Sequence, residues 1–369
     1  MSATIIQRMK GKLSRTILKV LGRLGKASAA AERRLKRRWR VGDTTREKLA
    51  ARYDDDEKRF VKSAFVEAGG IYRGDFGAAA DAAQLNALIT MEYHRIEKCL
   101  VMPERRAGAG QDVVKRLVAG IREHVERFGG TPEIEVGLAA LAVYGREMPR
   151  ESLTEETLRL LEEAERMRSG DWRKCPGIEG GYLILEKRAV AKVGGEMAAE
   201  FFRRRHSIRD YTDQPVGRED VVKIMEIART APSVCNRQAW TVHVIEEKRM
   251  VAAALALQNG NRGFGDRVPM VFVVAADLRA FVSIEERNQG WVDGGMFAMN
   301  VLHGIHATGL GGCPLNWCAS KENDEALRQL VGIPEHEAVI MMIALGHMPE
   351  SLRVARSTRR EVADIVRYV

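Results

Sequence analysis

The chain has 369 residues, enough for two or three domains of roughly 150 residues each and for a sizeable buried core. Its 45% hydrophobic and 30% charged residues exclude a collagen-like, low-complexity or largely disordered chain. The net charge of +9 is uneven, because residues 1–40 hold 13 of the 59 Lys and Arg but only one of the 50 Asp and Glu. The remainder carries 46 basic and 49 acidic residues, so no specific nucleic-acid partner is indicated.

The five cysteines are scattered and form no Cys-x-x-Cys pair, so neither a disulfide framework nor a thiolate zinc site is predicted. No apolar run approaches the roughly 18 residues that span a bilayer. Arg and Lys interrupt the N-terminus where a secretory signal needs an apolar stretch. We therefore expect a cytoplasmic protein.

Residues 1–43 are predicted to form a basic N-terminal arm. Apolar residues recur in it at intervals of three or four: Ile5, Met9, Leu13, Ile17, Leu21 and Leu24. Most Lys and Arg lie off this stripe, which is typical of an amphipathic helix at an anionic membrane surface. The alternative is a solvated basic arm without membrane contact.

Residues 44–179 are predicted to form an all-helical domain, since they contain long stretches rich in Glu, Lys, Arg, Ala and Leu, such as 112–128. One cluster, Glu92, His94 and Glu97, brings carboxylates and an imidazole together. A metal site in a helical bundle typically repeats a Glu-x-x-His pattern on two helices, and no such repeat occurs. We therefore predict a polar network that braces the bundle, and no metal site.

From residue 180 to residue 369, apolar strand-like runs alternate with helical ones. The predicted strands are 240–245, 270–275 and 338–345, and the predicted helices are 218–230, 293–308 and 324–331. Such alternation predicts a sheet with helices packed on it.

Two segments of this half carry the candidate chemistry. The first is the run from Arg203 to Arg209, in which guanidinium groups and the Ser207 hydroxyl suit a phosphate, although a basic cluster can also be a solvated face. The second is the segment 231–240, where Asn236 and Gln238 place amide groups that can read the edge of a heterocycle just before a strand.

Together the segments resemble the nitroreductase family of flavoproteins. The family pattern opens with Arg-x-Ser-x-Arg/Lys and continues with Pro-Val before a helix and then Ala-Pro-Ser-x-x-Asn-x-Gln-Pro-Trp. Asn261 and the run 309–316, Gly-Leu-Gly-Gly-Cys-Pro-Leu-Asn, extend the resemblance. Arg356 and Arg359 stand where family members return basic residues to the flavin phosphate. The resemblance covers about residues 200–369 and leaves out the helical half.

The resemblance implies FMN as cofactor and NAD(P)H as electron donor. The implied FMN-binding residues are Arg205, His206, Ser207, Arg209, Pro232, Ser233, Asn236, Gln238, Asn261, Leu315, Asn316, Arg356 and Arg359. It also implies a homodimer in which Pro232, Ser233 and Asn236 reach the flavin of the other subunit. No catalytic side chain is expected, because the flavin itself carries the hydride.

The sequence departs from the pattern at Val234, Ala239 and Phe264, where family members commonly carry Ser, Pro and, in some, a second cation near the ring. Cys235, which would lie beside the ring, is interpreted either as a reactive thiol or as a small buried residue. Trp291 and Trp317 are expected either over the flavin or in the core.

The expected fold class is therefore α+β, a nitroreductase-like homodimeric FMN domain with a central sheet flanked by helices, preceded by an all-helical region. The expected function is reduction of a nitroaromatic, quinone or related conjugated acceptor by a ping-pong mechanism. One alternative is a specialised flavoenzyme of a biosynthetic pathway, such as a pathway of cell-surface polysaccharide. Another is an inactive flavin-fold scaffold docked to a membrane.

Overall fold

The computed structural model describes residues 79, 81–103, 106–169, 178–184 and 194–369. The predicted basic arm, residues 1–43, lies outside the described residues, so its helix and its membrane contact stay predictions. The predicted division of the chain after residues 43 and 179 also stays a prediction. None of the helices in the described ranges is both long enough and apolar enough to cross a membrane.

Four helices pack around the first core of the protein. They are α3 (Ala82–Val101), α4 (Gln111–Phe128), α5 (Pro132–Glu147) and α6 (Glu155–Arg168). Local chemistry explains where three of them begin: the Asp81 side chain accepts a hydrogen bond from Gln84 N at 2.9 Å, Thr154 does the same for Thr157 N at 3.3 Å, and Pro132 opens α5. These are the residue types that favour helix starts.

The cluster around Glu92 joins two of these helices. The Glu92 carboxylate is fully buried and is bonded by Arg95 of α3 at 2.6 Å and by Arg116 of α4 at 3.2 Å. His94 pairs with Glu97 at 3.2 Å. A buried carboxylate needs such partners, so the cluster acts as the polar brace that its sequence predicts.

Four antiparallel strands form the sheet, in the order β1-β2-β4-β3. They are β1 (Trp240–Ile245), β2 (Met270–Asp277), β3 (Gly311–Asn316) and β4 (Glu337–Gly346). A bulge between Val274 and Ala275 shifts the register of β2 against β4. Beyond β3, Ser207 forms a parallel bridge with Gly312, and Ile208 N donates to Gly312 O at 3.0 Å.

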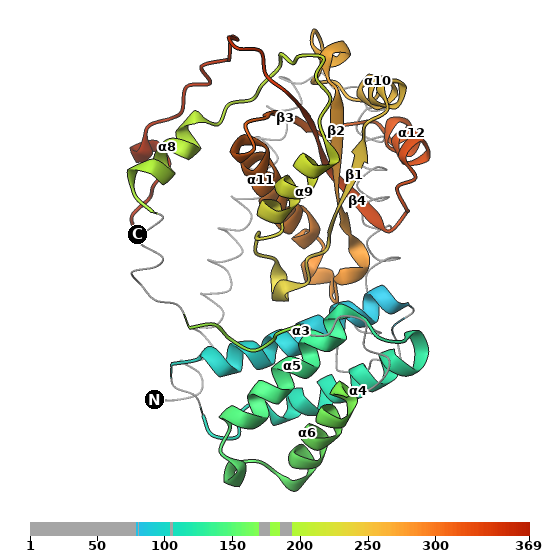
Figure 1. The fold of residues 1–369 in the computed structure, drawn as a ribbon, viewed down its shortest axis with the longest axis vertical. Helices are drawn as coiled ribbons and strands as arrows, with labels where there is room; N and C mark the ends of the chain where they lie inside the picture. The colour runs from blue at the N-terminus through green and yellow to red at the C-terminus, as the bar shows by residue number, and fades with distance from the viewer. Residues whose placement is uncertain (1–78, 80, 104–105, 170–177, 185–193) are drawn as a thin grey trace, which may run out of the picture. The chain divides into compact units, whose positions relative to one another are not determined.

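Helices cover both faces of the sheet (Figure 1). On one face lie α9 (Arg218–Ala228) and α11 (Gln289–Ala307), and on the other lie α10 (Lys248–Ala256) and α12 (Lys321–Val331). Alternate residues of β2 supply the two cores: Phe272 and Val274 face α9 and α11, whereas Val271 and Val273 face α10 and α12. A strand buried on both faces is apolar throughout, which is the pattern that predicts it.

The expected α+β architecture is thus confirmed, with strands β1, β2 and β4 and helices α9, α11 and α12 close to their predicted bounds. The alternation of apolar runs does not predict β3. Its residues Gly311, Gly312 and Pro314 are poor strand formers, and pairing with β4 makes the segment a strand. Helix α8 (Glu196–Arg204) is a further element that the alternation does not predict.

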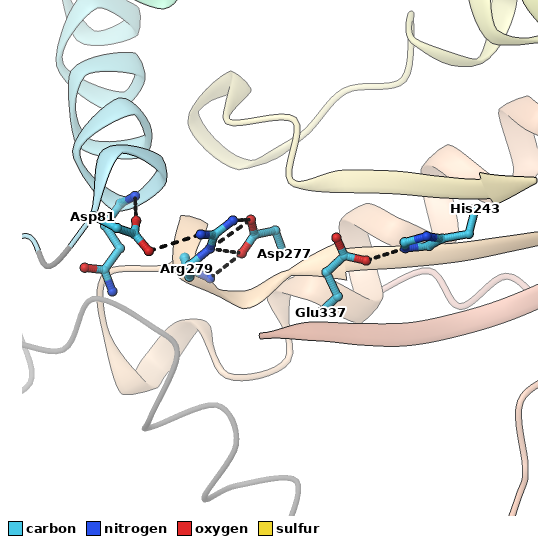
Figure 2. Close-up of polar contacts among 6 residues, drawn as sticks. Asp81, His243, Asp277, Arg279 and Glu337 are labelled. Carbon is cyan, nitrogen blue, oxygen red and sulfur yellow. Dashed lines mark hydrogen bonds and ion pairs between the residues drawn. The ribbon is translucent and has the colours of Figure 1, made fainter. Parts of the chain in front are cut away.

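Two polar links lie at one end of the sheet (Figure 2). Arg279, which follows β2, binds Asp277 at 2.6 Å and the α3 cap residue Asp81 at 3.0 Å. Glu337 at the start of β4 pairs with His243 of β1 at 2.6 Å. The first link ties the helical bundle to the sheet at the beginning of α3.

Candidate functional site

A cavity of about 440 Å³ brings together two predicted phosphate-binding segments that lie some 150 positions apart in the chain. Arg205, His206, Ser207 and Arg209 line it from the segment after α8. Residues 355–359, including Arg356 and Arg359, line it from the C-terminal segment. Six of the residues that the resemblance implies for FMN therefore share one cavity.

The donor set of this cavity fits a phosphate group. Among the described residues that line it are five arginines and three hydroxyl side chains, and no carboxylate. Guanidinium groups bind phosphate through paired, charge-assisted hydrogen bonds. Arg203, one of these five arginines, already pairs with the carboxylates of Glu196 and Glu200. The phosphate of FMN would thus be surrounded by hydrogen-bond donors in this cavity.

The sheet positions the first of these segments. The bridge from Ser207 to Gly312 ties the segment to β3, and Tyr211 donates from its buried hydroxyl to Ile208 O at 2.7 Å. Ile208 is itself buried, whereas Ser207 before it is half-buried and Arg209 after it is exposed. The alternation of an extended strand thus turns the polar side chains away from the core.

The positive charge of this segment affects the pKa values of groups on the neighbouring elements α11 and β3. Burial lowers the pKa of His303 and His306 on α11, and the charge of Arg205 lowers both further. Burial raises the pKa of the Cys313 thiol in β3, while Arg209 and Arg205 oppose that shift. Both imidazoles therefore favour the neutral form, and the arginines remain the source of positive charge beside the cavity.

A second group of predicted residues forms the loop between α9 and β1. Pro232 and Gln238 are exposed, and Ser233 and Asn236 are half-buried. Ser233 Oγ accepts from Gln238 N at 3.0 Å, and Gln238 Nε2 donates to Asn236 O at 3.2 Å. These residues do not line the arginine cavity of their own chain, and the resemblance assigns most of them to the flavin of the other subunit.

The remaining predicted residues form a third group, which is linked by Gln258. Asn261 Nδ2 donates to Leu255 O at 2.7 Å and to Gln258 O at 2.8 Å, so its amide nitrogen holds its own loop together. Gln258 Nε2 donates to Asn316 O at 3.0 Å. Leu315 is buried in β3, and the Asn316 side chain is exposed.

Two residues of the site were not predicted. Gln258, 6% exposed, joins the loop of Asn261 to β3, and Arg237, whose side chain is fully buried, binds Glu286 and Ala280 O from inside the loop 232–238. An arginine within an otherwise uncharged motif was the available signal for the second. For Gln258 the sequence offers no comparable signal.

Of the remaining aromatic candidates, two lie in the core and one is exposed. Trp317 donates to Asp324 Oδ1 at 2.8 Å and packs against the core on the α10 and α12 side. Phe264 is buried in the same core. Trp291, by contrast, is 40% exposed near the start of α11.

The sequence profile of the Nitroreductase family matches residues 202–259 and 247–347. A protein of Archaeoglobus fulgidus named as an NADH dehydrogenase/NAD(P)H nitroreductase is 32% identical over 147 residues, which are 39% of this chain and 80% of that protein. The FMN reductase [NAD(P)H] of Bacillus subtilis is 28% identical over 156 residues, 38% of this chain and 61% of that protein.

Among solved structures, an FMN-dependent nitroreductase of Clostridium difficile is 24% identical. The alignment covers 42% of this chain and 91% of the C. difficile chain, with a TM-score of 0.37. The profile match includes both the arginine segment before Ser207 and the loop 232–238, and the C-terminal segment of the cavity lies just beyond it. On the profile match and the A. fulgidus relative, the chain belongs to the nitroreductase family.

Proposed function

We propose that the protein is an FMN-dependent oxidoreductase that takes electrons from NAD(P)H and passes them to a nitroaromatic, a quinone or a related conjugated acceptor. The observation that carries the proposal is the arginine cavity, in which Arg205 and Arg209 meet Arg356 and Arg359 and none of the described lining residues is a carboxylate. Relatives named FMN reductase [NAD(P)H] and NADPH-flavin oxidoreductase support the choice of cofactor and donor.

Each part of the chain has a task in this proposal. Bound FMN supplies the hydride chemistry, since that is what flavins contribute to such enzymes. Arg205, Arg356 and Arg359 hold the phosphate, and the exposed Arg209 supplies a cation that favours negative charge on a reduced ring. No side chain of the site has to transfer a proton. The protein binds and orients the flavin and adjusts the charge around its ring.

A homodimer completes the proposed site. Large apolar side chains are exposed on α9 and α11, two helices that pack against each other: Val222, Ile227, Trp291, Val292, Met296 and Met299. Val292, Met296 and Met299 follow the spacing of one helix face. Exposed apolar patches of this kind mark interfaces, and a second copy of the chain covers this one in the proposed dimer. The loop 232–238, which follows α9, would then serve the partner's flavin.

The phosphate assignment is tested by FMN binding. Arg205→Ala and Arg356→Ala should each weaken FMN binding about ten- to a hundred-fold, because each removes hydrogen bonds to a charged group. Arg218→Ala is the matched control. It removes the same charge, but Arg218 is an exposed residue of α9 that pairs with Glu246 and lies outside the cavity. Wild-type affinity in both cavity variants would refute the assignment.

The reaction is tested on the purified, flavin-loaded protein. Anaerobic NADPH should bleach the visible flavin absorbance, and a nitroaromatic or quinone should restore it. Parallel lines in double-reciprocal plots at several acceptor concentrations are expected for a ping-pong reaction. A colourless protein that does not take up FMN would favour the scaffold, and bound FMN that NAD(P)H does not reduce would favour a specialised flavoenzyme.

A further inference from the structure

The loop between α9 and β1 has an unusual backbone. Cys235, Asn236 and Gln238 have φ angles of 48°, 54° and 50°, in the left-handed region that residues other than glycine rarely adopt. Asn tolerates this region better than Cys or Gln does. Three such residues within four positions persist only where the surroundings over-determine the conformation, and such clusters are typical of functional sites.

The loop is held by residues of the sheet domain and by a hydrogen bond between its own two ends. Val234 N donates to Asp293 Oδ2 of α11 at 3.1 Å, and Gln238 N donates to Ser233 Oγ. The Arg237 guanidinium is anchored on Ala280 O at 2.7 Å and on Glu286. These bonds act on the backbone or on Arg237, and they leave the side chain of Asn236 to another partner.

That partner comes from the helical bundle. Tyr93 of α3 is 4% exposed and belongs to the buried cluster against which Cys235 packs. The side chain of Asn236 is one of two hydrogen-bond partners of its hydroxyl, and the other is Thr90 on the same helix. Cys235 packs against the core of the bundle, while Ala87 of α3 packs with Ala239 at the end of the loop. The link from Arg279 to Asp81 fastens the start of the same helix to the sheet domain (Figure 2).

We infer that Tyr93 is a positioning residue for the flavin loop, holding the Asn236 carboxamide in the orientation in which it meets FMN. This inference rests on the proposed function, because Asn236 is a flavin ligand only there. A carboxamide offers up to four hydrogen-bonding positions, so one bond to a buried phenol fixes its orientation and leaves others for a ligand. The helical bundle, which lies outside the family match, thereby acts on the site through this loop.

The test compares Tyr93→Phe with a matched control, Tyr144→Phe. Tyr144 is a buried tyrosine of the same bundle whose hydroxyl donates to Ala109 O at 2.7 Å, within the bundle itself. Tyr93→Phe should weaken FMN binding about three- to ten-fold, the effect of one lost hydrogen bond. It should also speed hydrogen exchange of peptides that cover residues 232–239 in the flavin-free protein. Tyr144→Phe should change neither readout.

Asn236→Ala separates positioning from general stabilisation. If Tyr93 acts through Asn236, adding Tyr93→Phe to Asn236→Ala should cause no further loss of FMN affinity. The inference is overturned if Tyr93→Phe leaves FMN affinity and loop exchange at wild-type values, or if the two substitutions weaken binding independently. If the wild-type protein binds no FMN, the proposed function fails. Hydrogen exchange of residues 232–239 then still tests whether Tyr93 holds the loop. A wild-type exchange rate in Tyr93→Phe overturns the inference on its own.

Discussion

Arg237→Met should destabilise the protein far more than the loss of any exposed arginine. The side chain of Arg237 is 0% exposed and that of its partner Glu286 is 20% exposed. The guanidinium donates to Ala280 O at 2.7 Å, to Val234 O at 3.3 Å and to both carboxylate oxygens of Glu286. Methionine fills similar space but can satisfy none of these acceptors.

The magnitude follows from what is left behind. Removing one member of a buried ion pair costs about 3–5 kcal/mol, because the other charge stays buried and uncompensated. Glu286 keeps one donor, Val282 N at 2.8 Å, and is open enough for water to reach it. We therefore expect the low end of the range, about 3 kcal/mol of unfolding free energy.

Urea unfolding at neutral pH, followed by circular dichroism, measures the effect. Arg229→Met is the matched control, since Arg229 and Glu226 form an exposed pair with side chains 69% and 60% accessible, and such pairs contribute below about 1 kcal/mol. Arg237→Met combined with Glu286→Gln should recover part of the loss, because the buried charge is gone. Equal stability of Arg237→Met and Arg229→Met would refute the reasoning.

Three further predictions test the packing and the pH response. Gly304→Ala should cost about 1–3 kcal/mol, because a Cβ there would lie 2.7 Å from the backbone oxygen of Ile224 where α11 crosses α9; a thermal midpoint equal to wild type would contradict this. Asp81→Ala should lose the helix cap and the bond to Arg279, about 1–2 kcal/mol by urea unfolding, and Asp81→Asn should lose less because Asn also caps; equal losses would contradict it. Burial raises the pKa of Tyr144 to about 12 from an ordinary 10.0, so its contribution is complete below pH 10 and is lost as pH rises through 12. The stability gap between wild type and Tyr144→Phe should therefore narrow over that interval, and a constant gap would show that Tyr144 does not titrate there.

The sequence alone predicts those elements whose pattern is local. Strands β1, β2 and β4 are apolar runs of β-forming residues, and the cavity segments around Ser207 and Arg356 are predicted by family resemblance. β3 is different, because its glycines are required by neighbours that a sequence pattern does not display. A Cβ on Gly311 would lie 2.7 Å from Ile208 Cγ2, and one on Gly312 would lie 3.2 Å from Ile305 Cγ2.

The contact between Tyr93 and Asn236 is beyond local prediction for a related reason. The two residues lie 143 positions apart, and one of them belongs to a helical region that the family pattern does not include. Nothing in the periodicity of α3 separates a tyrosine that fills the bundle core from one that also bonds a loop. The role of this tyrosine depends on the packing of α3 against the sheet domain, through Asp81 before its first turn and Ala87 in its second turn.

The strand order also has a consequence for how the protein is made. β4 lies between β2 and β3 in the sheet but follows both along the chain. During synthesis, the open edge of β2 therefore has no native partner until residues 337–346 have left the ribosome. Helices α3–α6 make mainly local contacts and can pack earlier. In the interval, the nascent chain exposes an unpaired, apolar strand edge of the kind that promotes pairing between copies, so the synthesis of α11, β3 and α12 is the stage at which the chain is most exposed to aggregation.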